Sequence, residues 1–325
     1  MAEALLDISG LSVSFRTRRG TLKALRDVSL TVGRCEIVGI IGESGCGKST
    51  LINSIIGLLP ANAEKPSGHI GFAGEDIVGM AATRLQRLRG ERITTIFQDP
   101  MTALNPVLTI GTQMTAIQYR RSGSAGEKRR RAVAFLEKVR MPDAEKRLDH
   151  YPHQFSGGMR QRICIAMALL TEPDLLIADE PTTALDATLE VQVIRLIKDL
   201  QRDIGCSVLF ISHHLGAVAE LCERVAIMYA GEVVEHGPVR RIFRDPRHPY
   251  TRKLLDCDPG RVSEPMARLP TIGGELPDLV RLPQGCVFAA RCPERFERCG
   301  ERPPTVAVGC DHEADCHKAR EPARP

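Results

Sequence analysis

The sequence contains no apolar stretch long enough to cross a membrane. A spanning helix needs about 20 apolar residues, whereas the longest apolar run, Ile163 to Leu170, is much shorter and predicts a buried helical segment. The N-terminal sequence MAEALLDISG also lacks the basic start and the apolar core of a secretion signal. We therefore expect a cytosolic protein, and any role at a membrane must come through a partner.

The chain also lacks a strong excess of one charge. Its net charge of +4 at pH 7 is small for 325 residues and argues against a nucleic-acid-binding protein. The one dense basic run, Lys128 to Arg131, follows Ser124 and Glu127, whose spacing is typical of a helix capping box. We interpret this run as a solvated helix face.

Strand-like and helix-like patterns alternate along most of the chain. Apolar and polar residues alternate from Leu5 to Leu30, which predicts strands broken by a polar turn. This order of elements predicts an α/β domain with a largely parallel sheet. The segment of about 100–171 lacks strand character and predicts a helical subdomain. Short apolar strands are expected at Glu36–Ile41, Leu175–Ala178, Val208–Ile211 and Val225–Met228.

The eleven cysteines are distributed unevenly. Five are scattered through the first part and are interpreted as small buried hydrophobic residues, namely Cys35, Cys46, Cys164, Cys206 and Cys222. The other six crowd into the last seventy residues, where proline, glycine and arginine also dominate. Because a reducing cytosol disfavours lasting disulfides, this density indicates a metal centre. We therefore expect a domain at 1–255 and a small cysteine-rich domain at 256–325.

Residues Gly42 to Thr50 read GESGCGKST and match the P-loop pattern between a predicted strand and a predicted helix. Glycines allow the backbone to curl so that its amides face phosphate oxygens, and the N-terminus of the helix favours negative charge. We expect Lys48 to reach the β- and γ-phosphates of ATP and Ser49 to bind magnesium. The alternative is a glycine-rich turn of similar sequence.

The apolar run LLIADE, Leu175 to Glu180, predicts the second half of this site. An apolar strand would deliver Asp179 to the magnesium ion, as in the Walker-B arrangement. Glu180 follows and could accept a proton from the attacking water. Alone this motif is weak, because apolar strands often end in acidic residues, but it follows a complete P-loop.

Residues 155–162 read FSGGMRQR, which resembles the signature sequence of ABC ATPases. Gln98 in IFQDP, Ala184-Leu185-Asp186, and His213 in FISHH resemble the family's Q-loop, D-loop and switch histidine. Phe15 stands where the family stacks an aromatic ring on adenine. The resemblance runs from Leu5 to about Pro238. It implies a P-loop NTPase core of the ABC type with an antiparallel β subdomain and a helical subdomain.

In this family two cassettes enclose two ATP molecules, so the resemblance implies that Ser156, Gly157 and Gly158 act on ATP bound by a partner. The implied catalytic residues are Glu180, His213 and Gln98, and Ser49, Gln98 and Asp179 are the implied magnesium ligands. A lone histidine at a strand end is more often an ordinary surface histidine, but the position of His213 downstream of Asp186 favours the switch role. The implied nucleotide-binding residues are Phe15, Gly42, Glu43, Ser44, Gly45, Cys46, Gly47, Lys48, Ser49, Thr50, Gln98, Ser156, Gly157, Gly158 and Asp179.

Three further segments resemble the peptide and nickel importer branch: DPMTALNP at 99–106, HPYTRKLL at 248–255 and the tail at 269–293. They imply an ATP-hydrolysing subunit that powers import of dipeptides or oligopeptides, with nickel or another small solute as the alternative. The implied partners are a second ABC ATPase in a heterodimer, two permease subunits and an extracytoplasmic solute-binding protein. The implied location is peripheral, on the cytoplasmic face of the inner membrane.

Four tail cysteines match those of the branch: Cys286, Cys292, Cys299 and Cys316. Their spacing is wider than in typical structural zinc sites and by itself leaves zinc and iron–sulfur both open. The resemblance implies a 4Fe-4S cluster held by the four thiolates, with zinc or a metal-free tail as alternatives. Since ATP hydrolysis needs no redox chemistry, we expect a structural or regulatory role.

Other functions are weighed against specific residues. A non-transport ABC ATPase acting on DNA would carry a long coiled coil between P-loop and signature, which the sequence lacks. A translation-associated member would carry two cassettes in one chain, whereas this sequence carries one. A regulatory module without turnover would lack the acidic residue after the strand, whereas this sequence has Glu180 there.

Overall fold

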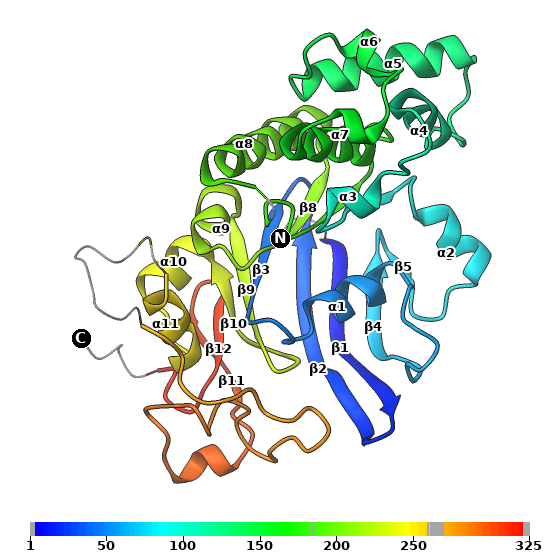
Figure 1. The fold of residues 1–325 in the computed structure, drawn as a ribbon. Coiled ribbons are helices and arrows are strands. Elements are labelled where there is room, and N and C mark those ends of the chain that lie inside the picture. The colour runs from blue at the N-terminus through cyan, green and yellow to red at the C-terminus, as the bar shows by residue number, and fades with distance from the viewer. Residues whose placement is uncertain (1–3, 184, 259, 261–269, 321–325) are drawn as a thin grey trace. The chain divides into compact units, whose positions relative to one another are not determined.

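The computed structural model describes residues 4–183, 185–258, 260 and 270–320 (Figure 1). Within these ranges the chain divides into two parts. We call residues 6–31, 37–79 and 212–320 the P-loop part, and residues 4–5, 32–36 and 80–211 the signature part. Each is described by itself.

The P-loop part contains an antiparallel sheet in the order β2-β1-β4-β5. Alternating burial along β1 and β2 places one face of each strand in the core, as the sequence pattern predicts. Their residues are β1 Ala4–Thr17, β2 Gly20–Gly33, β4 Ser67–Phe72 and β5 Glu75–Asp76.

A second group of strands in this part has the order β11-β12-β10-β9-β3. The buried strand β3 pairs in parallel with β9, whereas β9, β10, β12 and β11 pair antiparallel. Figure 1 shows the tail strand β12 beside β10, and β11 pairs with β12. The strands are β3 Ile37–Ile41, β9 Arg224–Tyr229, β10 Glu232–Pro238, β11 Thr305–Gly309 and β12 His312–Asp315.

Short helices complete the P-loop part. α1 begins at Lys48, as predicted, and α11 begins at Pro249, a residue that favours the first turn of a helix. The helices are α1 Lys48–Ile55, α9 Leu215–Leu221, α10 Val239–Arg244, α11 Pro249–Asp256 and the 3₁₀ helix η3 Glu297–Gly300.

The signature part is built on three parallel strands, β6, β7 and β8. All five residues of β8 and four of β7 are buried, as expected for parallel strands covered on both faces. The strands are β6 Ile93–Ile96, β7 Leu175–Asp179 and β8 Ser207–Ile211.

Helices dominate the rest of the signature part, and the predicted helical segment contains no strand among its described residues. The predicted capping box of Ser124 and Glu127 is present at the start of α5. None of the helices in the described ranges has the length and apolar composition of a membrane-spanning helix. The helices are α2 Ala82–Leu88, α3 Pro100–Ala103, α4 Ile110–Ala116, α5 Ala125–Lys138, α6 Ala144–Arg147, η1 Pro152–Gln154, α7 Gly157–Leu169 and α8 Ala187–Ile204.

Candidate nucleotide site and cysteine pocket

The loop from Gly42 to Gly47 curls because three of its residues have no side chain. A Cβ on Gly42 would lie 2.3 Å from the carbonyl oxygen of Met228, so only glycine fits there. Gly45 and Gly47 have φ angles of +81° and +110°, in the left-handed region that favours glycine. The glycines of the sequence motif therefore permit the curled loop.

Lys48 lies inside this loop. Its side-chain Nζ donates hydrogen bonds to the carbonyl oxygens of Gly42 at 2.6 Å and Glu43 at 3.2 Å. Lys48 is only 8% exposed. Its positive charge is thereby held at the start of α1, where a phosphate would also meet the main-chain amides of the first turn.

The other loop residues divide by exposure. Ser44, Gly45 and Ser49 are exposed, Glu43 and Thr50 are half-buried, and Cys46 is buried. Burial raises the pKa of the Cys46 thiol. The residue before α1, Gly47, offers no side chain to cap the helix, so the first-turn amides are not capped by a side chain. The loop can therefore present amides and the Ser49 hydroxyl to an anion and its cation.

The predicted acidic pair lies in the signature part, at the end of β7. Glu180 has a φ angle of +46°, which is unusual for a residue with a side chain. Its amide donates to the carbonyl oxygen of Ile211 at 2.9 Å. Its carboxylate accepts hydrogen bonds from Gln98 Nε2 at 3.2 Å and Thr183 Oγ1 at 3.1 Å. The structure thus brings Gln98 and Glu180 together, and Asp179 directly precedes Glu180.

The signature sequence forms the start of α7. Ser156 caps this helix by accepting a hydrogen bond from the Met159 amide. Ser156 and Gly157 are exposed, whereas a Cβ on Gly158 would lie 3.0 Å from the Leu189 side chain. The helix α7 is 13 residues long, and its exposed N-terminus can face an anion on a partner. Downstream, Asp186 caps α8, and Ala184 lies outside the described residues.

Two predicted residues stand apart from these motifs. Phe15 in β1 is half-buried and pairs with Ala63 through an isolated β-bridge. His213 is exposed in the turn before α9. Phe15, the P-loop and His213 lie in the P-loop part, and Gln98, Ser156–Gly158, Asp179 and Glu180 lie in the signature part.

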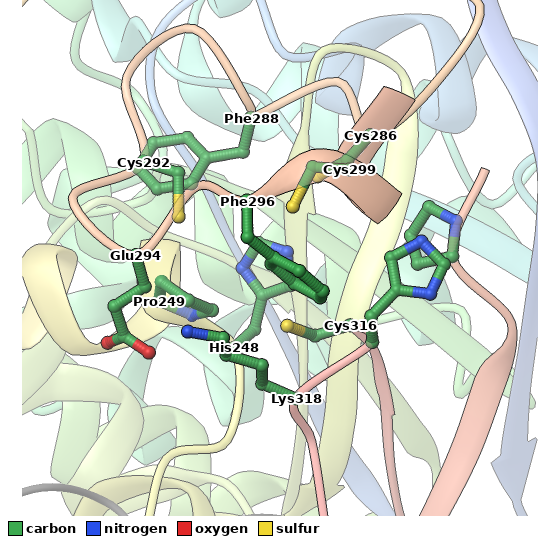
Figure 2. A pocket seen from close by; sticks show the side chains of 12 residues that line it. His248, Pro249, Cys286, Phe288, Cys292, Glu294, Phe296, Cys299, Cys316 and Lys318 are labelled. Carbon is green, nitrogen blue, oxygen red and sulfur yellow. The ribbon is translucent and has the colours of Figure 1, made fainter. Parts of the chain in front are cut away.

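Four tail cysteines line one pocket within the P-loop part. Cys286, Cys292, Cys299 and Cys316 come from separate places in the tail, and in Figure 2 their side chains lie around the ring of Phe296. The pocket encloses about 330 Å³ not filled by protein atoms, a volume that includes its opening to solvent. The remaining lining residues are His248, Pro249, Phe288, Glu294, Phe296, Pro303, His317 and Lys318.

Burial disfavours the thiolate form of three of these cysteines. Burial raises the pKa of Cys286 to about 11 and raises the pKa values of Cys292 and Cys316. Throughout the described ranges, no three His, Cys, Asp or Glu side chains are grouped closely enough to hold one metal ion. The pocket therefore brings the four predicted cysteines to one cavity without gathering them at one point.

One expectation about the cysteines is wrong. Cys46, Cys164, Cys206 and Cys222 are buried, as predicted, but Cys35 is exposed. Cys35 occupies a turn before β3 with a φ angle of +57°, and its thiol donates to the carbonyl oxygen of Gly205 at 3.0 Å. At this turn the Cys35 side chain faces solvent.

Contacts between the P-loop and the tail were not predicted. Arg291 forms an ion pair with Glu43, and Tyr250 accepts a hydrogen bond from the Glu43 amide. These pairs are more than 200 residues apart in sequence, so no local pattern reports them.

Comparisons with known proteins agree with these observations. A sequence profile described as ABC transporter matches residues 25–183, and one described as the C-terminal region of oligopeptide/dipeptide transporters matches residues 234–299. The chain is 47% identical to the dipeptide transport ATP-binding protein DppD of Bacillus subtilis, over 97% of this chain and 94% of that protein. It is 43% identical to the oligopeptide transport ATP-binding protein OppD of Salmonella typhimurium, over 98% and 94%.

Solved structures show the same fold. The ATP-binding cassette MJ0796, in a dimeric post-hydrolysis state bound to ADP and phosphate, matches with a TM-score of 0.64 and 29% identity, over 72% of this chain and 99% of that one. The cassette cbiO1 from Clostridium perfringens matches with a TM-score of 0.65 and 28% identity, over 74% and 91%. The fold and the motifs thus define an ABC ATPase cassette.

The chain belongs to the ABC transporter family, among the ATP-binding subunits of its oligopeptide/dipeptide branch. The predicted fold class and family are therefore confirmed. The roles of single residues, the domain boundary at 255/256 and a metal in the tail stay predictions.

Proposed function

We propose that this chain binds and hydrolyses ATP to power the import of dipeptides or oligopeptides across the cytoplasmic membrane. The observation that carries the proposal is the P-loop with Lys48 held inside it, on a chain 47% identical to a dipeptide transport ATP-binding protein. The loop supplies amides and a positive charge for phosphates. Glu180, oriented by Gln98 and Thr183, supplies a base for water.

In the proposed reaction Lys48 contacts the β- and γ-phosphates, and Glu180 orients and deprotonates the attacking water. Lys48 and His213 stabilise charge that develops on the transferred phosphoryl group. Phe15 stacks on the adenine ring. The strained backbone of Glu180 is consistent with a catalytic position, because left-handed conformations of residues with side chains concentrate at functional sites.

Magnesium fits the proposed ligands by their chemistry. Ser49 offers a hydroxyl, Asp179 a carboxylate and Gln98 an amide oxygen, all of them the hard oxygen donors that magnesium prefers. The ion would neutralise charge on the β- and γ-phosphates. The chain's own residues hold the phosphates and the water.

The proposed active assembly contains two cassettes. The capped, exposed N-terminus of α7, with Ser156 and Gly157, would face the γ-phosphate on a second ABC ATPase subunit, which we propose is a related chain in a heterodimer. The dimeric state of the MJ0796 cassette supports pairing of this kind. The cassettes would act from the cytoplasmic face on two permeases, with substrate supplied by an extracytoplasmic binding protein.

We also propose that the cysteine pocket holds a 4Fe-4S cluster. A cluster of four irons would take one thiolate at each iron, so its ligands can line a cavity, whereas zinc would require them to meet at one point. The four cysteines around one pocket fit this arrangement. The chain would use the cluster to order its tail.

Peptide import is tested by reconstituting the chain with its permeases, companion cassette and binding protein in liposomes. Peptides of two to five residues should stimulate ATP hydrolysis and accumulate inside the liposomes. Stimulation by nickel complexes but not by peptides would favour the small-solute alternative. ATP hydrolysis that is unaffected by permeases or binding protein would favour a non-transport ATPase.

A further inference from the structure

The second residue of the phosphate-binding loop is tied to the tail by a buried ion pair. The carboxylate of Glu43 accepts hydrogen bonds from both terminal nitrogens of Arg291, at 2.7 Å and 3.0 Å. The Arg291 side chain is 5% exposed and that of Glu43 is 26% exposed. A two-pronged pair of this kind fixes orientation as well as distance, which a single hydrogen bond does not.

Every hydrogen-bond donor of Arg291 has an acceptor. Beyond the two bonds to Glu43, the guanidinium donates to the carbonyl oxygens of Gly273 at 2.9 Å and Ile272 at 3.0 Å, and to the Tyr229 hydroxyl at 3.2 Å. A guanidinium has five N–H groups, and five bonds are formed. Arg291 is therefore held rigidly and can in turn hold Glu43.

The backbone of Glu43 is also held by a residue far from the loop in sequence. Its amide donates to the Tyr250 hydroxyl at 3.1 Å. Tyr250 is completely buried and packs against Tyr229 and Phe288, with ring centroids 4.6 Å and 5.4 Å away. Both the main chain and the side chain of Glu43 thus depend on residues that lie far beyond the loop in sequence.

The same tail segment lines the cysteine pocket. Phe288 contributes to the pocket wall, and Arg291 is followed directly by Cys292. A change in the order of this segment would therefore reach Glu43 through Arg291. Because Lys48 donates to the carbonyl oxygen of Glu43, a shift of Glu43 would also move a contact of the phosphate-binding lysine.

We propose that Arg291 is a positioning residue for ATP binding, which holds the phosphate-binding loop in its curled conformation and makes nucleotide affinity depend on the order of the tail. This inference rests on the proposed ATP-binding function. Without Arg291 the loop would occupy its ATP-binding conformation only part of the time. The apparent affinity for ATP would then fall in proportion to the fraction of molecules in that conformation.

The test compares full-length Arg291→Gln and Arg291→Lys with wild type in the assembled transporter. Arg291→Gln should raise the KM for MgATP about tenfold with kcat changed less than about twofold, because the loop is depopulated while the catalytic groups stay intact. Arg291→Lys keeps the charge but loses the fork, so its KM should lie between the two. Equal KM values in all three proteins would overturn the proposal.

Arg19→Gln is the matched control. Arg19 also pairs with a tail residue, Asp278 at 2.6 Å, but its side chain is 75% exposed and no bond joins it to the loop. Its KM should equal that of wild type. A rise equal to that of Arg291→Gln would show a general effect of loosening the tail and would also overturn the specific role of Arg291.

A second readout does not require turnover. Hydrogen exchange at the amides of residues 43–48, in nucleotide-free protein, should speed up in Arg291→Gln and not in Arg19→Gln. Unchanged exchange would contradict the proposal even if the KM rose. Failure of the wild-type chain to bind ATP at all would instead refute the proposed function, so the two outcomes are distinguishable. Melting temperatures identify any variant that has simply lost its fold.

Discussion

The phosphate-binding loop and the cysteine pocket lie in the same part of the chain but are built in opposite ways. The loop is one contiguous run, Gly42 to Thr50, whose glycines set its backbone and whose lysine bonds back to its own carbonyls. The pocket is lined by residues between His248 and Lys318, drawn from a helix, loops and the chain beyond β12. The loop sets most of its backbone geometry through its own residues and is held from outside at Glu43, whereas every part of the dispersed pocket depends on the fold around it.

This difference predicts that substitutions in the two regions affect ATP binding and hydrolysis to different extents. Changes in the loop or at the catalytic acid should remove binding or chemistry directly. Changes in the pocket should remove the proposed cluster but reach ATP only through the tail's contact with Glu43.

The largest expected effect concerns chemistry without binding. Glu180→Gln keeps the shape of the side chain and can still bond to Gln98 and Thr183, but it loses the base. Steady-state ATP hydrolysis should fall by roughly a hundredfold or more, with ATP affinity unchanged. Turnover close to wild type would remove Glu180 from its proposed role.

The next effect concerns binding. Lys48→Ala removes the one lysine held inside the loop, so ATP affinity should fall about 10- to 100-fold, the range expected for losing hydrogen bonds to a charged group. Equilibrium binding of a fluorescent ATP analogue measures this loss. Lys65→Ala is a suitable control, because Lys65 is a lysine outside the loop. An unchanged affinity in Lys48→Ala would count against the loop as the phosphate site.

A smaller effect on ATP is expected from the pocket. Cys286→Ser combined with Cys299→Ser should abolish iron and sulfide in anaerobically purified protein, together with the visible absorbance of a cluster. ATP affinity should change by less than the tenfold expected for Arg291→Gln. Cys310→Ser, which alters an exposed cysteine outside the pocket, should keep its iron. Wild-type protein that contains zinc, or no metal, would refute the cluster.

The smallest expected effect is a contrast in reactivity. Cys46 is 1% exposed and burial raises its pKa, whereas Cys35 is exposed at a turn. Alkylation at neutral pH should therefore modify Cys35 at least about tenfold faster than Cys46. Peptide mass spectrometry over time measures both rates in one sample. Equal rates would mean that the loop opens far more readily than the structure indicates.

The sequence predicted well what is encoded locally. The strand β3, the loop and the start of α1 follow from one continuous pattern, and the capping box of Ser124 follows from residues three positions apart. The position of the acidic residues Asp179 and Glu180 was also predicted, because they stand at the end of the apolar strand β7.

Long-range contacts were not predictable in this way. The strand β10 reads EVVEHGP, with charged residues, glycine and proline, and it forms through pairing with β9 and β12. The ion pair of Arg291 and Glu43 spans 248 residues. The four tail cysteines were grouped by family resemblance, since their spacing alone does not state which of them share a cavity.

The central claim is that the loop around Lys48 holds ATP while Glu180 activates the water that cleaves it. A single-turnover experiment tests this most directly, with radiolabelled MgATP added to the assembled transporter and both bound nucleotide and released phosphate measured in each sample. Wild type should bind ATP and release phosphate, and Glu180→Gln should retain intact ATP. Wild-type protein that neither retains nor cleaves ATP, or Glu180→Gln that releases phosphate at the wild-type rate, would contradict it.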